Sequence, residues 1–335
     1  MPRLVTRMRR IAWLSLLSTM LALGVLAYGY AGHRWALARA PLELVVEQGD
    51  TARTLAASLR RQGVVLPAWA FVAAARLRGD ATRLRAGSFE LEGPVSLREL
   101  LDRIVQGDPS HREVRLLEGW TFRQIREALA AQPLLRQELP GLSDAQLLAR
   151  LGASEPAPEG LFHPDTYSFA PQSSDVALLQ RAYRRQQRLL ADTWERRRPD
   201  SPLRTPYEAL VLASIVEKET GRAEDRPHVA GVFLNRLRRG MLLQSDPTTI
   251  YGLGEAFDGN LRRRDLLADT PYNTYVRAGL PPTPIAAPGL AALRAVVEPA
   301  QTNALYFVAR GDGTSQFSDT LEAHNRAVRQ FQKGR

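Results

Sequence analysis

The first pattern along the chain is an uncharged, mostly apolar run of about 21 residues at positions 11–31. A helix of that length can cross a hydrocarbon core of about 30 Å. Arginines precede the run and no acidic residue occurs before Glu43, so we expect residues 1–10 in the cytoplasm and everything after the run outside. A cleaved signal peptide is the alternative, although the apolar stretch of such a leader is usually only about 7–15 residues.

The next pattern, over residues 41–109, combines short extended segments with amphipathic helical ones. Ser96 and Glu99 have the spacing of a capping box, and Gly63 ends an earlier helix. A strand, two helices and a further strand make a small α+β unit, which resembles the LysM-like module that often accompanies cell-wall enzymes. A generic packing module is the alternative. The predicted elements are a strand at 42–46, helices from 51 and from 67, an extended segment at 88–91 and a helix from 96.

The pattern of extended and helical segments starts again at residue 112. It follows a turn-forming sequence, Gly107-Asp108-Pro109, that we take as the domain boundary. Gly311-Asp312-Gly313 separates two extended segments, as in a β-hairpin. The pattern over residues 112–330 therefore predicts a larger mixed α+β domain. For the whole chain we predict the α+β fold class, with an N-terminal transmembrane helix, the small module and this domain. Its helices are predicted from 121, from 143, at 175–197, 205–219, 225–239 and 289–297, and from 320.

The net charge of +10 could suggest a nucleic-acid partner, but the basic residues form no stripe. All of the 45 basic residues except Lys218 and Lys333 are arginine, and they are scattered among acidic ones, so we expect no nucleic-acid binding. The lack of cysteine excludes thiolate nucleophiles and cysteine-ligated zinc. The five histidines have no metal-ligand spacing, so we expect no metal and no cofactor.

The helix predicted at 205–219 carries a candidate acid. Pro206 at its first position and Gly221 just past its end define its limits. At about 100° per residue, Glu219 falls within the apolar arc of the helix, whereas Glu217 falls outside it. We therefore expect Glu219 to be buried, with its pKa raised towards the range of a general acid, and Glu217 to be exposed. The alternative is that Glu219 turns to solvent or pairs with an arginine.

Three segments, 159–167, 244–251 and 271–275, mix aromatic residues with short hydrogen-bonding side chains. A groove for sugars needs both kinds of group. The last two segments lie within 242–288, a stretch of little periodicity, and long ordered loops are usually functional. Ordinary turns are the alternative. The candidate binding residues are Glu159, Phe162, Asp165, Tyr167, Gln244, Ser245, Asp246, Thr248, Tyr272, Asn273 and Tyr275.

Seven short stretches of distinctive sequence occur one after another within residues 112–330. They are EGLFHPDT at 159–166, ASIVEKET at 213–220, VFLNRL at 232–237, MLLQSDPT at 241–248, YNTY at 272–275, GLPP at 279–282 and LYFVA at 305–309. Together they closely resemble the YceG-like endolytic murein transglycosylases, also called the MltG family. His163 stands where that family commonly has an aromatic residue.

The resemblance implies a lyase that cleaves the MurNAc–GlcNAc β-1,4 bond within a glycan strand and leaves a 1,6-anhydroMurNAc end. The second glutamate of the family's Glu-Lys-Glu segment is the essential one, and it matches Glu219, which would act first as acid and then as base. The implied partners are peptidoglycan glycan strands, the inner membrane and, as candidates, peptidoglycan synthases. The implied location is the cell inner membrane, with the C-terminal domain in the periplasm.

Two other functions stay open. In a muramidase-type hydrolase, Asp246 or Asp165 would orient a water molecule opposite Glu219. In a non-catalytic peptidoglycan-binding scaffold of the growth or division machinery, Glu219 would have no chemical role.

Overall fold

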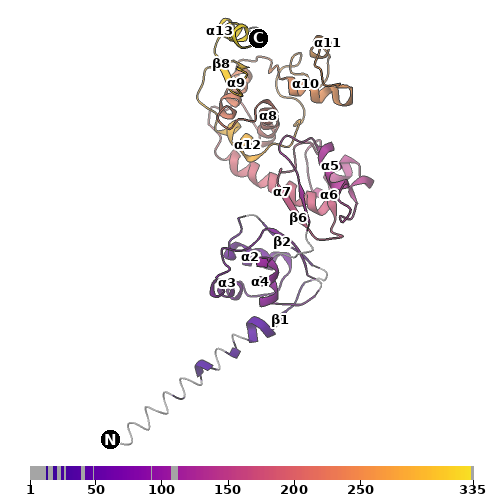
Figure 1. Cartoon of the computed structure of the whole chain (residues 1–335), viewed down its shortest axis with the longest axis vertical. Helices are drawn as coiled ribbons and strands as arrows, with labels where there is room; N and C mark the ends of the chain where they lie inside the picture. The colour runs from indigo at the N-terminus through magenta and orange to yellow at the C-terminus, as the bar shows by residue number, and fades with distance from the viewer. Residues whose placement is uncertain are drawn as a thin grey trace, which may run out of the picture. The chain divides into compact units, whose positions relative to one another are not determined.

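The computed structural model describes residues 13, 18–20, 24–25, 28–38, 42–47, 49–91, 93–106 and 112–332. The chain divides into two compact units: Met1–Glu113 with Ser168–Gln172, and Val114–Tyr167 with Ser173–Arg335. Helices and small two-stranded sheets confirm the α+β fold class (Figure 1). Most of the expected anchor, residues 11–31, lies outside the described residues, and within the described part no helix has the length and apolarity to cross a membrane.

The first unit is built on an antiparallel pair of strands, β2 and β3, in which Leu44 lies opposite Phe89. The strands and three helices share a core that includes Leu44, Leu55, Phe71 and Leu100. The order strand, helix, helix, strand is the predicted one, while the likeness to a LysM module stays a prediction. The elements are η1 (Tyr28–Gly32), β1 (Arg34–Trp35), β2 (Leu42–Val46), α2 (Ala52–Gln62), α3 (Ala68–Leu77), β3 (Gly87–Leu91), β4 (Val95–Ser96) and α4 (Leu97–Gln106).

Local signals explain where these helices begin and end. Thr51 caps α2 and accepts the N–H of Thr54 (3.2 Å), so α2 begins one residue later than predicted. Gly63 ends α2 at a φ of 106°, a left-handed conformation that glycine adopts without steric cost. Ser96 and Glu99 form the predicted capping box of α4, with hydrogen bonds of 3.0 and 3.2 Å.

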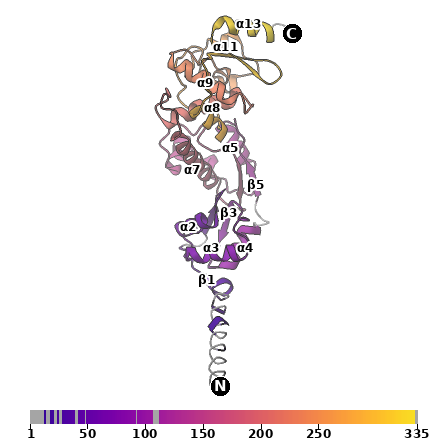
Figure 2. The same ribbon diagram turned by 90° about the vertical axis from the view of Figure 1, so that its left-hand side faces the viewer.

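The second unit is organised around α8, which packs against α7 and α9 (Figure 2) and against α10 and α12 (Figure 1). Residues 209–216 of α8 are all buried, so this helix forms the centre of the unit. The elements of this unit are α5 (Phe122–Ala130), η2 (Leu139–Gly141), α6 (Asp144–Leu151), α7 (Asp175–Trp194), α8 (Pro206–Glu219), α9 (Arg226–Arg238) and α12 (Leu290–Val297). The short strands β5 (Arg112–Arg115) and β6 (Thr166–Phe169) each have residues in both units.

The end of the chain forms the predicted hairpin. Strands β7 (Tyr306–Ala309) and β8 (Ser315–Ser318) pair in antiparallel register, with Phe307 opposite Phe317. Helix α13 (Leu321–Phe331) packs against both strands.

The prediction of an irregular loop at 242–288 was wrong in part. This stretch contains α10 (Asp246–Leu253), η3 (Gly254–Ala256) and α11 (Arg263–Leu266). These helices are too short to show a helical period in the sequence. Pro247, near the start of α10, was the available signal, because proline is favoured in the first turn of a helix.

Candidate active site

Helix α8 fixes the position of the candidate acid, Glu219, which is its last residue. Thr205 caps the start of the helix by accepting the N–H of Glu208 (3.2 Å). Inside the unit, Ser214 donates to a backbone carbonyl of α8 and accepts the N–H of Ile285 (3.0 Å). The buried hydroxyl is thus satisfied, and the packed helix holds its final turn in one place.

The carboxyl group of Glu219 is largely but not fully buried, and it has one hydroxyl partner. Ser245 Oγ donates to Glu219 Oε1 over 2.5 Å. Burial raises the pKa of Glu219 to about 7, while the Ser245 hydrogen bond lowers it and the charge of Asp246 raises it. Within the described part of the chain Oε2 has no hydrogen-bond partner, and it is not among the buried unpaired atoms. Oε2 is therefore the oxygen available to a substrate.

Ser245 is itself held on both sides. Its N–H donates to Thr274 Oγ1 (3.0 Å), and its carbonyl accepts the hydroxyl of Thr248 (2.7 Å). The preceding residue, Gln244, takes a left-handed φ of 50° and donates its N–H to the Thr274 carbonyl (3.1 Å). These bonds leave Ser245 little freedom to move away from Glu219.

Arg236 of α9 holds the same loop through its backbone carbonyls, and it was missing from the predicted site. Its guanidinium donates to the carbonyls of Leu243 and Leu305, each over 2.7 Å. Its charge also lowers the pKa of Glu219. The signal was present in the sequence, because Arg236 follows Val229 and Phe233 at the spacing of an apolar helix face. A buried arginine on such a face needs acceptors, which the loop carbonyls supply.

Asn273 organises α10 and α11 and does not face a ligand. Its side-chain amide donates to three carbonyls between residues 265 and 268, the shortest bond being 2.7 Å to Ala268. Its Oδ1 accepts the Thr249 hydroxyl and the Tyr275 N–H. Asn273 and Thr248 are both fully buried. Their predicted role as sugar-binding residues is therefore corrected to a structural one.

Three predicted residues keep side-chain surface that a ligand can reach: Gln244 and Asp246 are exposed, and Tyr275 is half-buried. The Tyr275 hydroxyl donates to Asp246 Oδ1 over 2.5 Å. Burial, followed by this hydrogen bond, raises the pKa of Tyr275. Asp246 and Tyr275 interact electrostatically with Glu219, and Gln244 directly precedes Ser245, the hydrogen-bond partner of Glu219.

The segment 159–167 makes its contacts elsewhere. Phe162 is 0% exposed and stacks on Phe122 at 5.2 Å between ring centroids. The buried Tyr167 donates its hydroxyl to a backbone carbonyl (2.7 Å), and Asp165 pairs with Arg185 (2.8 Å). Phe162 and Tyr167 therefore have no free face for a sugar, which corrects their prediction. The sequence pattern could not distinguish a ring that meets a sugar from a ring that meets another ring.

Glu159 is a second buried carboxylate in this unit. Both of its oxygens accept the N–H of Phe122 (3.0 and 3.1 Å), and Oε2 also accepts the Tyr251 hydroxyl (3.0 Å). Burial raises the pKa of Glu159 to about 7 as well. Tyr251 lies edge-on to Tyr272, whose hydroxyl is 2.9 Å from Thr283 Oγ1. Glu159 thus joins the start of α5 to α10.

The prediction that Glu217 is exposed was wrong. Its side chain is only 6% exposed, and Oε2 accepts the N–H of Gly289, the N-cap of α12, over 2.9 Å. Burial raises its pKa. The prediction assumed that α8 has one buried face and one exposed face. In the structure α12 covers the face outside the apolar arc, so the assumption fails for this central helix.

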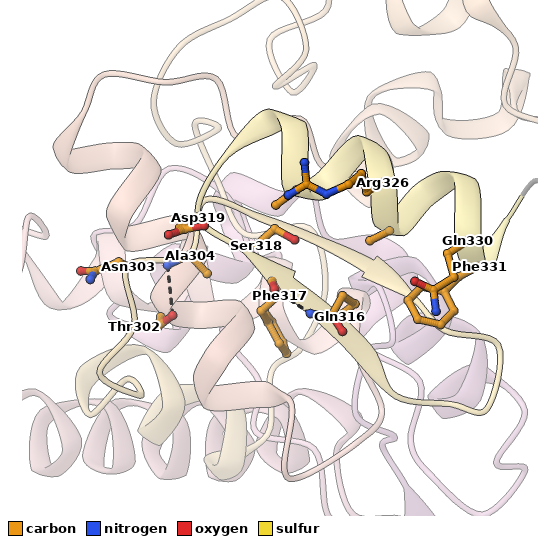
Figure 3. A pocket seen from close by; sticks show the side chains of 12 residues that line it. Thr302, Asn303, Ala304, Gln316, Phe317, Ser318, Asp319, Arg326, Gln330 and Phe331 are labelled. Atoms are coloured by element: carbon orange, nitrogen blue, oxygen red, sulfur yellow. Dashed lines mark hydrogen bonds between the residues drawn. The ribbon is translucent and has the colours of Figure 1, made fainter.

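A surface pocket of about 540 Å³ lies in another part of the second unit, between the β7–β8 hairpin and α13 (Figure 3). Arg326 and Gln330 of α13 line it together with Gln316 of β8. None of the predicted site residues lines it. Within the ranges that the structure describes, no cluster of three or more His, Cys, Asp or Glu could hold a metal ion.

The second unit thus holds a largely buried carboxyl, Glu219, with one unpartnered oxygen among the described residues. The chain belongs to the YceG-like family, whose sequence model matches residues 44–330. It is 28% identical to an endolytic murein transglycosylase of Bacillus subtilis (strain 168), over 85% of this chain and 83% of that protein.

Two further comparisons agree with this family. The chain is 28% identical to an endolytic murein transglycosylase of Streptococcus pneumoniae serotype 2, covering 90% of this chain but only 62% of that longer protein. A crystal structure of a yceG-like protein from Listeria monocytogenes matches with a TM-score of 0.54 and 27% identity, over 85% of this chain and 98% of that one.

Proposed function

We propose that the chain is an endolytic murein transglycosylase with Glu219 as its general acid and base. The observation that carries the proposal is the environment of Glu219: its pKa is raised to about 7, Ser245 holds Oε1, and Oε2 is unpartnered within the described residues. A carboxyl with such a pKa can donate a proton at neutral pH and accept one afterwards. The names of the relatives from Bacillus and Streptococcus support the same reaction class.

In the proposed reaction, Glu219 gives its proton to the oxygen that leaves MurNAc C1, and the C1–O bond breaks. The C6 hydroxyl oxygen of the same MurNAc then bonds to C1, and its proton passes to the Glu219 carboxylate. The products are a GlcNAc end and a 1,6-anhydroMurNAc end, no water is consumed, and Glu219 is again protonated. No second carboxylate is needed as a nucleophile, because the substrate supplies its own.

Gln244, Asp246 and Tyr275 are the proposed contacts for the glycan next to the scissile bond. All three side chains are at least partly exposed, and the negative charge of Asp246 raises the pKa of Glu219. Tyr272 is half-buried and is a fourth candidate contact. Asp246 is also the residue that would orient water in a hydrolase, so the nature of the product end decides between the two reactions.

We further propose that residues 11–31 anchor the chain in the inner membrane, with the remainder in the periplasm where the glycan strands lie. The support is the length and lack of charge of the run and the arginines before it. Residues 41–109 would form a LysM-like module between the anchor and the catalytic domain at 112–330, and peptidoglycan synthases are the candidate partners.

The test is mass spectrometry of purified glycan strands after digestion. The wild-type chain should release fragments with 1,6-anhydroMurNAc ends, and Glu219→Gln should release none while still sedimenting with the strands. Glu224→Gln, which changes an exposed carboxylate near α9, is the matched control and should match the wild type. Reducing ends would identify a hydrolase. Glycan binding without cleavage by the wild type would identify a scaffold.

A further inference from the structure

The first unit has an apolar surface that its own core does not use. Trp69 is 69% and Leu77 is 88% exposed, and both lie on one face of α3, while Phe71 and Ala75 on the opposite face are buried. Val65, just before α3, is 60% exposed. We call Val65, Trp69, Val72, Ala73 and Leu77 the α3 patch, although Val72 also packs against the core of the unit. Large exposed apolar side chains that lie together usually mark a binding surface.

A shallow hollow of about 440 Å³ lies within the α3 patch, between α2 and α3, which pack side by side (Figure 1). Its walls are alanines, Val72 and the ring of Trp69, and its rim carries Arg53 and Arg76. No Asn, Asp, Gln, Glu or Ser lines it. A sugar site combines an aromatic face with such hydrogen-bonding side chains, as the surface around Asp246 and Tyr275 does.

The rim of the α3 patch is positively charged. Arg53 of α2 and Arg76 of α3 line the hollow and are exposed, and Arg60 and Arg61 are exposed further along α2. In the part of the chain that the structure describes, none of these four side chains has an acidic partner. Arg78, just beyond α3, differs because it pairs with Asp80 and Asp102, each over 2.7 Å. The rim therefore offers free guanidinium groups to an external anion.

Tryptophan and arginine around an apolar surface are the side chains found where proteins meet the lipid–water interface. Chain length adds a second argument, because β1 begins at Arg34, only a few residues after the apolar run at 11–31. An extended residue spans at most about 3.6 Å, so a run that crosses the bilayer keeps this unit close to its surface. Such tethering raises the effective concentration of the lipid at the patch.

We propose that the α3 patch docks on the anionic phospholipid surface of the membrane in which residues 11–31 are anchored. Trp69 and Leu77 enter the headgroup region, and Arg53 and Arg76 bind the lipid phosphates. The inference rests on the proposed anchor, but it is independent of the chemistry at Glu219.

The absence of cysteine from the chain makes the test direct, because one introduced cysteine carries a nitroxide label at a single position. The full chain is reconstituted in vesicles of phosphatidylethanolamine with phosphatidylglycerol. Collisions of the label with oxygen, which prefers lipid, are compared with collisions with a water-soluble nickel chelate. Leu77→Cys reports the α3 patch, Gly24→Cys reports the anchor, and Arg98→Cys, on α4 with a 64% exposed side chain, is the control in water.

The expected result is a several-fold higher oxygen-to-nickel ratio at position 77 than at position 98. Adding Arg53→Glu with Arg76→Glu should bring position 77 back to the value at 98, and so should vesicles of phosphatidylcholine alone, which carry no net charge. An unchanged melting temperature shows that the charge-reversed chain is folded.

Equal ratios at positions 77 and 98, with position 24 in lipid, would overturn the docking proposal and leave the anchor intact. Shielding of position 77 by added glycan strands, in place of lipid, would overturn it in favour of wall binding. A label at position 24 that lies in water would refute the anchor. The oxygen-to-nickel ratio at position 77 would still test the α3 patch, because a high ratio supports docking and a low one overturns it.

Discussion

Glu219 and Glu159 have the same raised pKa of about 7 for the same reason, burial, but their hydrogen bonds differ. Glu159 accepts a backbone N–H with both oxygens and a tyrosine hydroxyl with one. Glu219 accepts a single hydroxyl with Oε1. One carboxylate is thus saturated by its own protein, and the other keeps an oxygen for a substrate.

The difference teaches that a raised pKa does not identify a catalytic acid by itself. Desolvation alone produces the shift in both places, and at Glu159 it accompanies a structural link between the start of α5 and α10. What separates Glu219 is an oxygen with no partner among the described residues, together with the nearby charge of the exposed Asp246. The following variants test that distinction, from the largest effect on activity to the smallest.

Glu219→Gln should have the largest effect. It removes the only proton donor proposed for the leaving oxygen, so turnover should fall by about a thousandfold. Stability should not fall, because an amide carries no charge to desolvate in this position. Turnover is measured by release of soluble fragments from glycan strands, and stability by the melting temperature. Turnover within tenfold of the wild type would remove Glu219 from the mechanism.

Ser245→Ala should have the next largest effect. Its hydroxyl orients the Glu219 carboxyl and lowers its pKa, so its loss should reduce kcat about tenfold and raise the pKa. Because the protonated form is the active acid, the fall of kcat/KM at alkaline pH should move to higher pH. Ser245→Thr keeps a hydroxyl and should restore the wild-type profile. An unshifted profile in the alanine variant would contradict this positioning role.

Asp246→Asn should move the same profile the other way. The negative charge of Asp246 raises the pKa of Glu219, so the neutral amide should lower it and shift the alkaline fall of kcat/KM to lower pH. The rate at low pH should drop only a few-fold if Asp246 acts by charge and substrate contact. A complete loss of cleavage would instead indicate that Asp246 takes part in the chemistry, as in a hydrolase.

Glu159→Gln should change activity least and stability most. The amide NH2 cannot accept the Phe122 N–H and Tyr251 hydroxyl as two oxygens do, so we expect a loss of about 1–3 kcal/mol in the free energy of unfolding. Turnover per folded molecule should stay close to that of the wild type. A large fall in turnover at unchanged melting temperature would place Glu159 in the reaction instead.

The same variant carries a pH signature. The folded-state pKa of Glu159 is raised from 4.5 to about 7, so the native state binds the extra proton between these values. The stability that this proton contributes is fully present below about 4.5 and is lost as the pH rises through about 7. The free energy of unfolding, measured in urea across this pH range, should therefore fall less steeply with rising pH for Glu159→Gln than for the wild type. Equal slopes would mean that Glu159 titrates normally.

The sequence predicted what depends on local signals. Capping residues such as Ser96 and Thr121 and the left-handed Gly63 mark helix ends in a few consecutive positions, and the structure has helices there. These helix limits need no knowledge of distant residues. The arc of α8 also predicted the burial of Glu219, but every face of residues 209–216 is covered, so the arc did not distinguish Glu219 from Glu217.

Features that depend on distant partners were not predictable in the same way. Glu217 is buried because α12, about seventy residues later, covers it, and the sequence gives no sign of that contact. Phe162 and Asn273 are residue types suited to a sugar site, but they contact other parts of the chain instead: Phe162 stacks on Phe122, and Asn273 binds backbone carbonyls. The three carbonyls that Asn273 satisfies become apparent only once α11 is in place.

The central claim is that the Glu219 carboxyl is still protonated near neutral pH, and an NMR titration of the chain with 13C-labelled glutamate carboxyls tests it most directly. Two resonances should titrate near pH 7; Glu219→Gln should remove one of them, and Glu159→Gln the other. A resonance lost in Glu219→Gln that titrates near its ordinary value of 4.5 would contradict the account.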